Sequence, residues 1–251
     1  MENDFEIYGG FAGVYDEFMD NVSYDEWYDF LHYLLEEYGK EKGCVVELAC
    51  GTGEITKRLS GSGYQVTGID LSEDMLALAR EKCQDEVLLL HQDMCELELC
   101  GEADAFVCAG DGMNYLLERE QLFQVFQNVS RYLKKDGIFL FDLKTDYYFR
   151  EVVGNRTITD NREDASYIWE NSYDEAKMRN EYLLTVYKLV DDERDLFERT
   201  DELHYQQVFP VEVVKEELER AGLVLKQAYE AFTGERPKED SERLYIAAAK
   251  R

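Results

Sequence analysis

Val45-Val-Glu-Leu-Ala-Cys-Gly-Thr-Gly53 joins a short apolar run to a turn that contains two glycines. The β-branched valines favour a strand. Gly51 and Gly53 have no Cβ, so a ligand can lie directly against the main chain of the turn. Ile55 and Leu59 follow at helical spacing. A strand, a glycine-rich turn and a helix in this order are typical of the first unit of a nucleotide-binding α/β sheet.

The alternation of strand and helix continues on both sides of this turn. A helix is expected over residues 23–38, where Ser23 and Glu26 form a capping box, and another helix is expected to begin after Ser72. Further strands are expected at 65–69, 87–91, 105–109 and 138–143, and a helix at 122–133 that ends at Lys134-Lys-Asp-Gly137. We therefore predict an α/β, Rossmann-like fold in which helices cover both faces of a parallel sheet.

The pattern changes in the third quarter of the chain, where polar and apolar residues alternate without a helical period. Antiparallel strands are expected at 167–169, 182–190 and 196–209, with a turn at 191–195. Phe197, Leu203, Tyr205 and Phe209 share one face of the last strand. A helix at 213–221 and a hairpin of 223–232 with 244–249 follow. Residues 1–143 and 210–251 are thus expected to form the main domain, and residues 144–209 an inserted antiparallel β-cap.

The composition argues against several classes of partner and site. The chain has 251 residues, of which 27 are basic and 55 acidic, and its formal net charge is −28. A field of this sign repels polyanions, so we expect no nucleic-acid partner. The six cysteines include no C-x-x-C pair and the chain has three histidines, so we predict no metal site. No apolar run has the length of a signal peptide or a membrane span, and we expect a cytoplasmic protein without membrane association.

Two carboxylates flank the glycine-rich turn. Glu47 lies at the end of the first strand, and Asp70 ends the second, where it can accept hydrogen bonds from a ribose diol. A nicotinamide-dinucleotide fingerprint would have a third glycine where Thr56 stands, and Glu47 and Glu54 would repel a pyrophosphate. The same carboxylates would attract a sulfonium and an ammonium group. The charges therefore favour S-adenosylmethionine over NAD as the cofactor.

The segment also resembles motif I of the class I S-adenosylmethionine-dependent methyltransferases, usually written E/D-x-G-x-G-x-G, with Ala49 in place of the first glycine. Three later segments follow in the family's order: Val66-Thr-Gly-Ile-Asp-Leu-Ser72 is similar to motif II, Leu90-His-Gln-Asp-Met94 to motif III and Ala103-Asp-Ala-Phe-Val-Cys-Ala-Gly-Asp111 to motif IV. The resemblance covers residues 40–145. It implies that Asp70 binds the ribose, that Asp93 binds the adenine amino group and that Met94 lies near the adenine ring.

Other segments resemble a bacterial subgroup of methyltransferases whose acceptors are unassigned: Phe11-Ala-Gly-Val-Tyr-Asp16, Asp111-Gly-Met-Asn-Tyr-Leu116, Phe139-Leu-Phe-Asp142 and a β-cap that ends in His204-Tyr-Gln-Gln. In related enzymes an aromatic residue of the first segment helps to close the cofactor pocket, which makes Tyr15 the candidate here. The cofactor-binding residues expected on this basis are Tyr15, Glu47, Ala49, Cys50, Gly51, Gly53, Asp70, Leu71, Met75, Asp93, Met94 and Ala109.

Four residues are candidates for an acceptor site beneath the cap. Asp111, Asn114 and Tyr115 follow the strand expected at 105–109, on the edge where ligands bind in open α/β sheets. They can orient an acceptor, or equally cap a helix and fill its core. His204 is either a general base or a structural histidine of a strand, and Trp169 and the cap tyrosines are expected to pack within the sheet. Methyl transfer mainly requires alignment and exclusion of water, so no catalytic residue is assigned.

Three functions remain open at this point. The first is in-line methyl transfer to a small-molecule acceptor, and an amine or another cation would suit a cap in which acidic residues outnumber basic ones over 160–202. The second is methylation of RNA or protein, of which RNA is disfavoured by the net charge. The third is a non-catalytic module that binds S-adenosylmethionine. Thr56 and Glu47 disfavour an NAD-dependent enzyme, and the sequence does not indicate an oligomeric state.

Overall fold

The structure is a computed structural model that describes residues 12–19, 23–83 and 87–251. Within these residues the main sheet has seven strands in the order β10-β11-β5-β4-β1-β2-β3. Their bounds are β1 Cys44–Leu48, β2 Gln65–Asp70, β3 Leu88–His91, β4 Ala103–Cys108, β5 Leu133–Lys144, β10 Leu223–Glu230 and β11 Arg243–Lys250. Strands β1 to β5 are parallel, and β11 pairs antiparallel with both β5 and β10. The predicted parallel sheet and its closing hairpin are confirmed.

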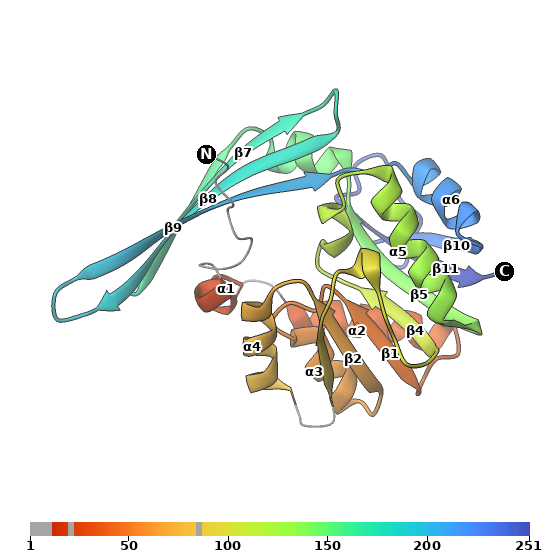
Figure 1. Cartoon of the computed structure of the whole chain (residues 1–251). Helices are drawn as coiled ribbons and strands as arrows, with labels where there is room; N and C mark the ends of the chain where they lie inside the picture. The colour runs from red at the N-terminus through yellow and green to blue at the C-terminus, as the bar shows by residue number, and fades with distance from the viewer. Residues whose placement is uncertain (1–11, 20–22, 84–86) are drawn as a thin grey trace.

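Helices cover both faces of this sheet (Figure 1). The longer ones are α1 Ala12–Phe18, α2 Tyr24–Glu37, α3 Glu54–Gly61, α4 Glu73–Lys82, α5 Arg119–Tyr132 and α6 Val211–Arg220, and the short ones are η1 Met94–Glu96, η2 Gly112–Tyr115 and η3 Tyr148–Val153. One apolar core joins α5 and α6 to the sheet, and a second joins α2 and α3 to its opposite face. In the described part of the chain, no helix is both long and apolar enough to cross a bilayer.

The expected helix starts are present, whereas one expected helix end is wrong. The Ser23 hydroxyl accepts from the Glu26 amide at 3.3 Å, and the Ser72 hydroxyl accepts from the Met75 amide at 3.2 Å. Helix α5 ends at Tyr132, so Lys134-Lys-Asp-Gly137 belongs to β5 instead of a helix terminus. Pairing overrides the local signal here, because Leu133 is in register with Ala103 and the Lys134 ammonium bonds the Asp104 carboxylate at 2.9 Å.

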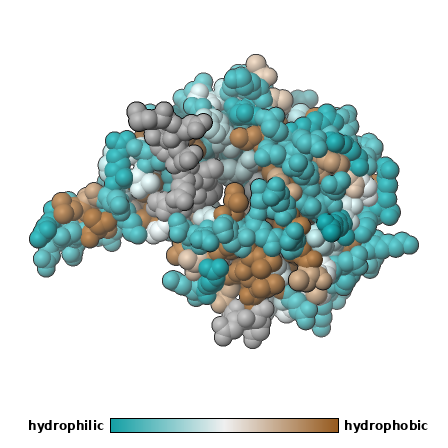
Figure 2. All heavy atoms as spheres, in the orientation of Figure 1, coloured by the Kyte–Doolittle hydropathy of each residue, from teal (hydrophilic) through white to brown (hydrophobic). Residues whose placement is uncertain are grey.

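A second, antiparallel sheet lies beside the main domain and projects well beyond it (Figure 1). Its strands, in the order β6-β7-β8-β9, are β6 Thr157–Asn161, β7 Ala165–Asp174, β8 Arg179–Asp191 and β9 Leu196–Gln207. The three expected strands and the turn between the last two are confirmed, while β6 and η3 were not anticipated. At the outer end of β8 and β9, Figure 2 shows apolar side chains among hydrophilic ones. The exposed large apolar residues there are Val190, Leu196 and Phe197.

The buried face of β9 is the polar one. Glu202, His204 and Gln206 are at most 2% exposed, whereas Leu203 and Tyr205 of the alternate face are partly exposed. Phe209 lies beyond the end of the strand, in the core of the main domain. The alternation of β9 was therefore predicted, but its apolar face does not turn inward. The inner face is apolar on β7 and β8, where it packs against α1, whereas at β9 it borders a cavity with His204 and Gln206.

Candidate functional site

The glycine-rich turn between β1 and α3 contains three residues in the left-handed region of backbone space. They are Ala49 with φ 52°, Gly51 with φ 53° and Gly53 with φ 79°. A Cβ on Gly51 would meet no atom within 4 Å, whereas a Cβ on Gly53 would lie 3.0 Å from the Ala79 Cβ of α4. Gly51 thus leaves room for a ligand, and Gly53 allows two helices to approach each other.

Asp70 joins this turn to the end of β2. One carboxylate oxygen accepts from the Gly51 amide at 2.7 Å, and the other accepts from the Ser72 amide at 2.9 Å. Burial raises the pKa of Asp70, against these hydrogen bonds, which lower it. A carboxylate has about four acceptor positions, so this group can accept a further hydrogen bond from a ligand hydroxyl.

Glu47 is the buried carboxyl group at this end of the site. It is 2% exposed and accepts a hydrogen bond from the Thr56 hydroxyl. Burial raises the pKa of Glu47 to about 8. A cation that entered the cavity beside it would favour the ionised form, so this carboxyl group suits a positively charged ligand.

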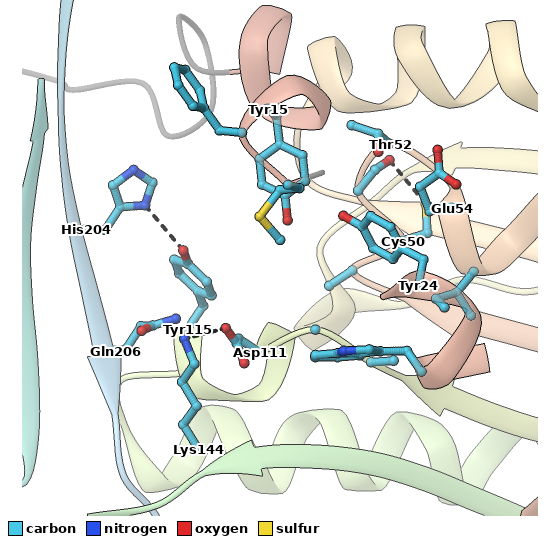
Figure 3. Close-up of a pocket in the computed structure, with 18 of the residues that line it drawn as sticks. Tyr15, Tyr24, Cys50, Thr52, Glu54, Asp111, Tyr115, Lys144, His204 and Gln206 are labelled. Atoms are coloured by element: carbon cyan, nitrogen blue, oxygen red, sulfur yellow. Dashed lines mark hydrogen bonds and ion pairs between the residues drawn. The ribbon is translucent and has the colours of Figure 1, made fainter. Parts of the chain in front are cut away.

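Helix α1 bridges the glycine-rich turn and the second sheet. The Asp16 carboxylate accepts from the Thr52 hydroxyl at 2.7 Å and pairs with the Lys82 ammonium at 2.5 Å. On its other side, the Phe18 ring meets the Tyr167 ring edge-on, with centroids 4.8 Å apart. Tyr15 projects from α1 into the space between the two sheets (Figure 3). Phe11, the first residue of the expected N-terminal signature, lies outside the described residues.

A cavity of about 410 Å³ extends from the glycine-rich turn to the inner face of the second sheet. Of the residues expected in a site, it is lined by Tyr15, Glu47, Ala49, Cys50, Gly51, Ala109, Asp111, Tyr115 and His204. The structure places the others outside this lining: Gly53, Asp70, Leu71, Met75, Asp93, Met94 and Asn114. Met75 is buried at 2% exposure, Leu71 is 65% exposed, and the Asp93 carboxylate accepts from the Cys95 amide at 2.7 Å.

Asn114 connects the two sheets and does not face the cavity. Its side-chain amide donates to the Gln207 carbonyl at 2.9 Å, and its side-chain oxygen accepts from the Lys144 amide at 2.9 Å. The residue is fully buried. Of the two alternatives for Asn114, this geometry supports the structural one, since both ends of the amide are engaged by backbone.

An ionic cluster lines the cavity where the two sheets meet (Figure 3). The Asp111 carboxylate pairs with Lys144 at 2.7 Å and with Arg243 at 2.5 Å. Arg243 also pairs with Asp142, and its guanidinium lies 4.5 Å from the centre of the Trp27 ring. Burial alone would raise the pKa of Asp111, but the two cations hold it well below its usual value. Lys144 and Arg243, which are cross-strand partners of β5 and β11, were not among the residues predicted from the sequence.

The side of the cavity formed by the second sheet contains a chain of polar contacts. The Tyr115 hydroxyl lies 2.6 Å from the Tyr182 hydroxyl and 3.5 Å from Nδ1 of His204. Nε2 of His204 lies 3.0 Å from the Glu202 carboxylate, and the His204 and Tyr182 rings stack at 4.7 Å. Glu202 and Tyr182 were not identified from the sequence, although Glu202 and His204 are two residues apart on a strand and therefore share a face.

Comparison with known proteins supports the assignment of this chain as a methyltransferase. A family model described as a methyltransferase domain matches residues 45–137. The chain is 40% identical over 249 residues to YqeM of Bacillus subtilis (strain 168), a provisionally named methyltransferase, and the match covers 97% of each chain.

Solved structures agree with this match. An S-adenosylmethionine-dependent methyltransferase from Clostridium acetobutylicum ATCC 824 superposes with a TM-score of 0.84 at 25% identity, covering 98% of this chain and 99% of that one. The sugar N-methyltransferase KedS8 from Streptoalloteichus sp ATCC 53650 has the same fold, with a TM-score of 0.79 at 18% identity and coverage of 95% and 93%. The chain belongs to the class I S-adenosylmethionine-dependent methyltransferases, and S-adenosylmethionine is its cofactor.

Proposed function

We propose that this enzyme transfers the methyl group of S-adenosylmethionine to the nitrogen of a small-molecule amine. The observation that carries the proposal is the continuous cavity of about 410 Å³ between the glycine-rich turn and the inner face of the second sheet. In this proposal the cofactor occupies the turn end, in the domain formed by residues 1–143 and 210–251. The amine occupies the other end, beneath a β-cap formed by residues 144–209.

The residues at the turn end fit the cofactor. Gly51 leaves open space for it, Glu47 faces its ammonium group, and Asp70 has lone pairs for the ribose hydroxyls. Asp93 and Met94 follow β3 at the same edge of the sheet and would border the adenine. Tyr15 would close the pocket from α1 (Figure 3). The bound sulfonium supplies a methyl carbon that is already activated, so these residues need only hold it in line and exclude water.

The cap end of the cavity suits a small cation. Tyr148, Trp169 and Tyr182 present aromatic rings to it, and such rings attract ammonium groups. The Lys144 and Arg243 charges there are offset by Asp111 and Asp142, so they do not make this end basic. The sugar N-methyltransferase KedS8, which has the same fold, supports an amine of modest size.

The alternatives have less support. The formal charge of −28 opposes binding of RNA, and a cavity of about 410 Å³ that also holds the cofactor leaves little room for a folded protein substrate. A non-catalytic binding module would not need a polar pocket beside the cofactor. All six cysteines are free thiols, which supports the expected cytoplasmic location.

Calorimetric titration with S-adenosylmethionine, S-adenosylhomocysteine and NAD tests the cofactor end, on the wild type and on Asp70→Ala. We expect micromolar binding of the first two, no binding of NAD, and loss of binding in the variant. Release of S-adenosylhomocysteine in the presence of small amines then tests the acceptor. Binding of NAD alone would refute the proposal. Turnover with tRNA but with no amine would mean that the acceptor is RNA and not a small amine.

A further inference from the structure

Two residues of β9 and two tyrosines from separate elements form a directed chain of hydrogen bonds at the cap end of the cavity. A carboxylate only accepts hydrogen bonds, so in a neutral His204 ring the Nε2 atom, 3.0 Å from Glu202, carries the proton. Nδ1 is then the acceptor, and it faces the Tyr115 hydroxyl at 3.5 Å (Figure 3). Burial raises the pKa of Tyr182, so its hydroxyl stays protonated and can donate to the Tyr115 oxygen at 2.6 Å.

The burial of these hydrogen-bonded residues is unusual for side chains that only support the fold. Glu202 and His204 are 1% and 0% exposed, and burying an ionisable pair costs free energy that an apolar pair of similar size would not. Their cross-strand partners on β8 are Leu184 and Tyr182, so the same inner face does accept apolar and aromatic side chains. Tyr115 and His204 line the cavity, whereas Glu202 lies behind His204. The arrangement resembles in form the acid, imidazole and hydroxyl of hydrolase triads.

We infer that Glu202, His204 and Tyr115 form a proton relay that converts the bound acceptor from an ammonium ion to a neutral amine. This inference rests on the proposed N-methylation. The ammonium proton passes to the Tyr115 oxygen while the Tyr115 hydroxyl proton passes to Nδ1 of His204, and the resulting imidazolium is stabilised by Glu202. The amine nitrogen then uses its free electron pair to bond the methyl carbon, and the electron pair of the broken carbon–sulfur bond stays on sulfur.

The roles of the residues differ. Tyr115 contacts the acceptor and His204 receives the proton, so these two are the catalytic residues. Glu202 is a positioning residue, because it acts on the acceptor only through His204, and Tyr182 orients the Tyr115 hydroxyl. An ammonium ion has no free electron pair on nitrogen, so a base is required as long as the acceptor enters protonated. At a pH where the free amine is already neutral, the relay becomes dispensable.

The first test is kinetic and uses methylamine, ethanolamine, putrescine and glucosamine as probe acceptors, with release of S-adenosylhomocysteine as the readout. For any probe that turns over, we expect kcat to fall at least about 100-fold in His204→Gln and at least about tenfold in Glu202→Gln and Tyr115→Phe at pH 7. The Kd of S-adenosylmethionine should change less than about twofold, since none of these residues belongs to the glycine-rich turn or to the carboxylates beside it.

The pH profile separates a relay from a structural role. We expect the loss in Glu202→Gln to shrink as the pH rises toward the pKa of the probe amine, because less acceptor then needs deprotonation. Among the described residues, the titratable groups that contact His204 are Tyr115 of η2, Tyr182 of β8 and Glu202 of β9. A loss that is the same at every pH, or that is accompanied by loss of cofactor binding, would mean that the residues only support the fold and would refute the relay.

His32 and Glu36 provide a matched control. They form a second histidine–carboxylate pair at 3.5 Å, on α2 and partly exposed, away from the cavity lining. His32→Gln and Glu36→Gln should leave kcat and its pH profile unchanged. If the wild type binds S-adenosylmethionine but methylates none of the four amines, the amine acceptor and the relay fail while the cofactor assignment stands. If the cofactor does not bind, the proposed function itself fails.

A measurement without any acceptor tests the relay independently. The chain has three histidines, so side-chain nitrogen NMR of the S-adenosylhomocysteine complex can be assigned with His204→Gln and His32→Gln. The geometry predicts the tautomer with the proton on Nε2, beside the Glu202 carboxylate, and with Nδ1 free of a proton. A proton on Nδ1 would leave no acceptor for the Tyr115 hydroxyl and would overturn the inference.

Discussion

The main sheet and the second sheet form opposite ends of one cavity, and they do so with different kinds of residue. At the turn end, β1 and β2 are largely buried on both faces and contribute backbone and two carboxylates, Glu47 and Asp70. At the cap end, β9 turns Glu202, His204 and Gln206 inward. A strand that is buried on both faces can position a ligand only through its ends and its turn. A strand with one polar face can instead contact a ligand along its length, which allows the acceptor end to differ among enzymes that share one cofactor.

The strongest test of this difference between the two sheets is to place a side chain in the glycine-rich turn. Gly51→Val places a side chain at φ 53° in the space proposed for the cofactor, so we expect affinity for S-adenosylmethionine to fall at least about 100-fold, as measured by calorimetry. Gly53→Val is the matched control, because its side chain would clash with Ala79 and should chiefly lower the melting temperature. If both variants bound the cofactor normally, the turn would not be its site.

The same contrast explains what could be predicted from the sequence. Glu47, Gly51 and Asp70 belong to short motifs in which local order determines position, so their grouping was foreseen. Alternation along 196–209 predicted the strand, which ends at Gln207 in the structure, but not which face turns inward, because that depends on what covers the face. The pairing of Asp111 with both Lys144 and Arg243 depends on the register of β5 and β11, in which these two cations are neighbours. The two positions are about 100 residues apart, so no local pattern reveals the pairing.

A second prediction concerns the connection between the two ends. Asn114→Ala removes the side-chain bonds to the Gln207 carbonyl and to the buried Lys144 amide, so both backbone groups lose a partner. We expect the free energy of unfolding to fall by about 1–3 kcal/mol in urea titrations. Asn128→Ala, on α5 and away from the cap, is the control that removes bonds within the main domain only. A larger loss of acceptor turnover in Asn114→Ala than in Asn128→Ala would show that the cap depends on this connection.

A third prediction uses the charge at the turn end. Because burial raises the pKa of Glu47 to about 8, the group is mostly protonated at neutral pH in the empty site and must lose its proton to face a cation. Affinity for S-adenosylmethionine should therefore increase with pH, by roughly tenfold from pH 6 to pH 7, with release of about one proton on binding. Glu47→Gln should bind more weakly and lose this slope. A slope that persists in the variant would assign the proton to another group.

The smallest effect is expected at the outer end of the second sheet, where Phe197 is 43% and Leu196 is 47% exposed. Phe197→Ser should change the free energy of unfolding by less than about 0.5 kcal/mol and leave cofactor affinity unchanged, because the side chain already contacts water. Leu184→Ser, on the inner face and 5% exposed, is the comparison and should be markedly more destabilising. If the two variants were equally destabilising, the outer end of β8 and β9 would have to be covered in solution. The sheet could then not be described as a cap that uses only its inner face. The difference between these two positions on paired strands therefore tests directly whether the inner face, and not the whole sheet, builds the acceptor end.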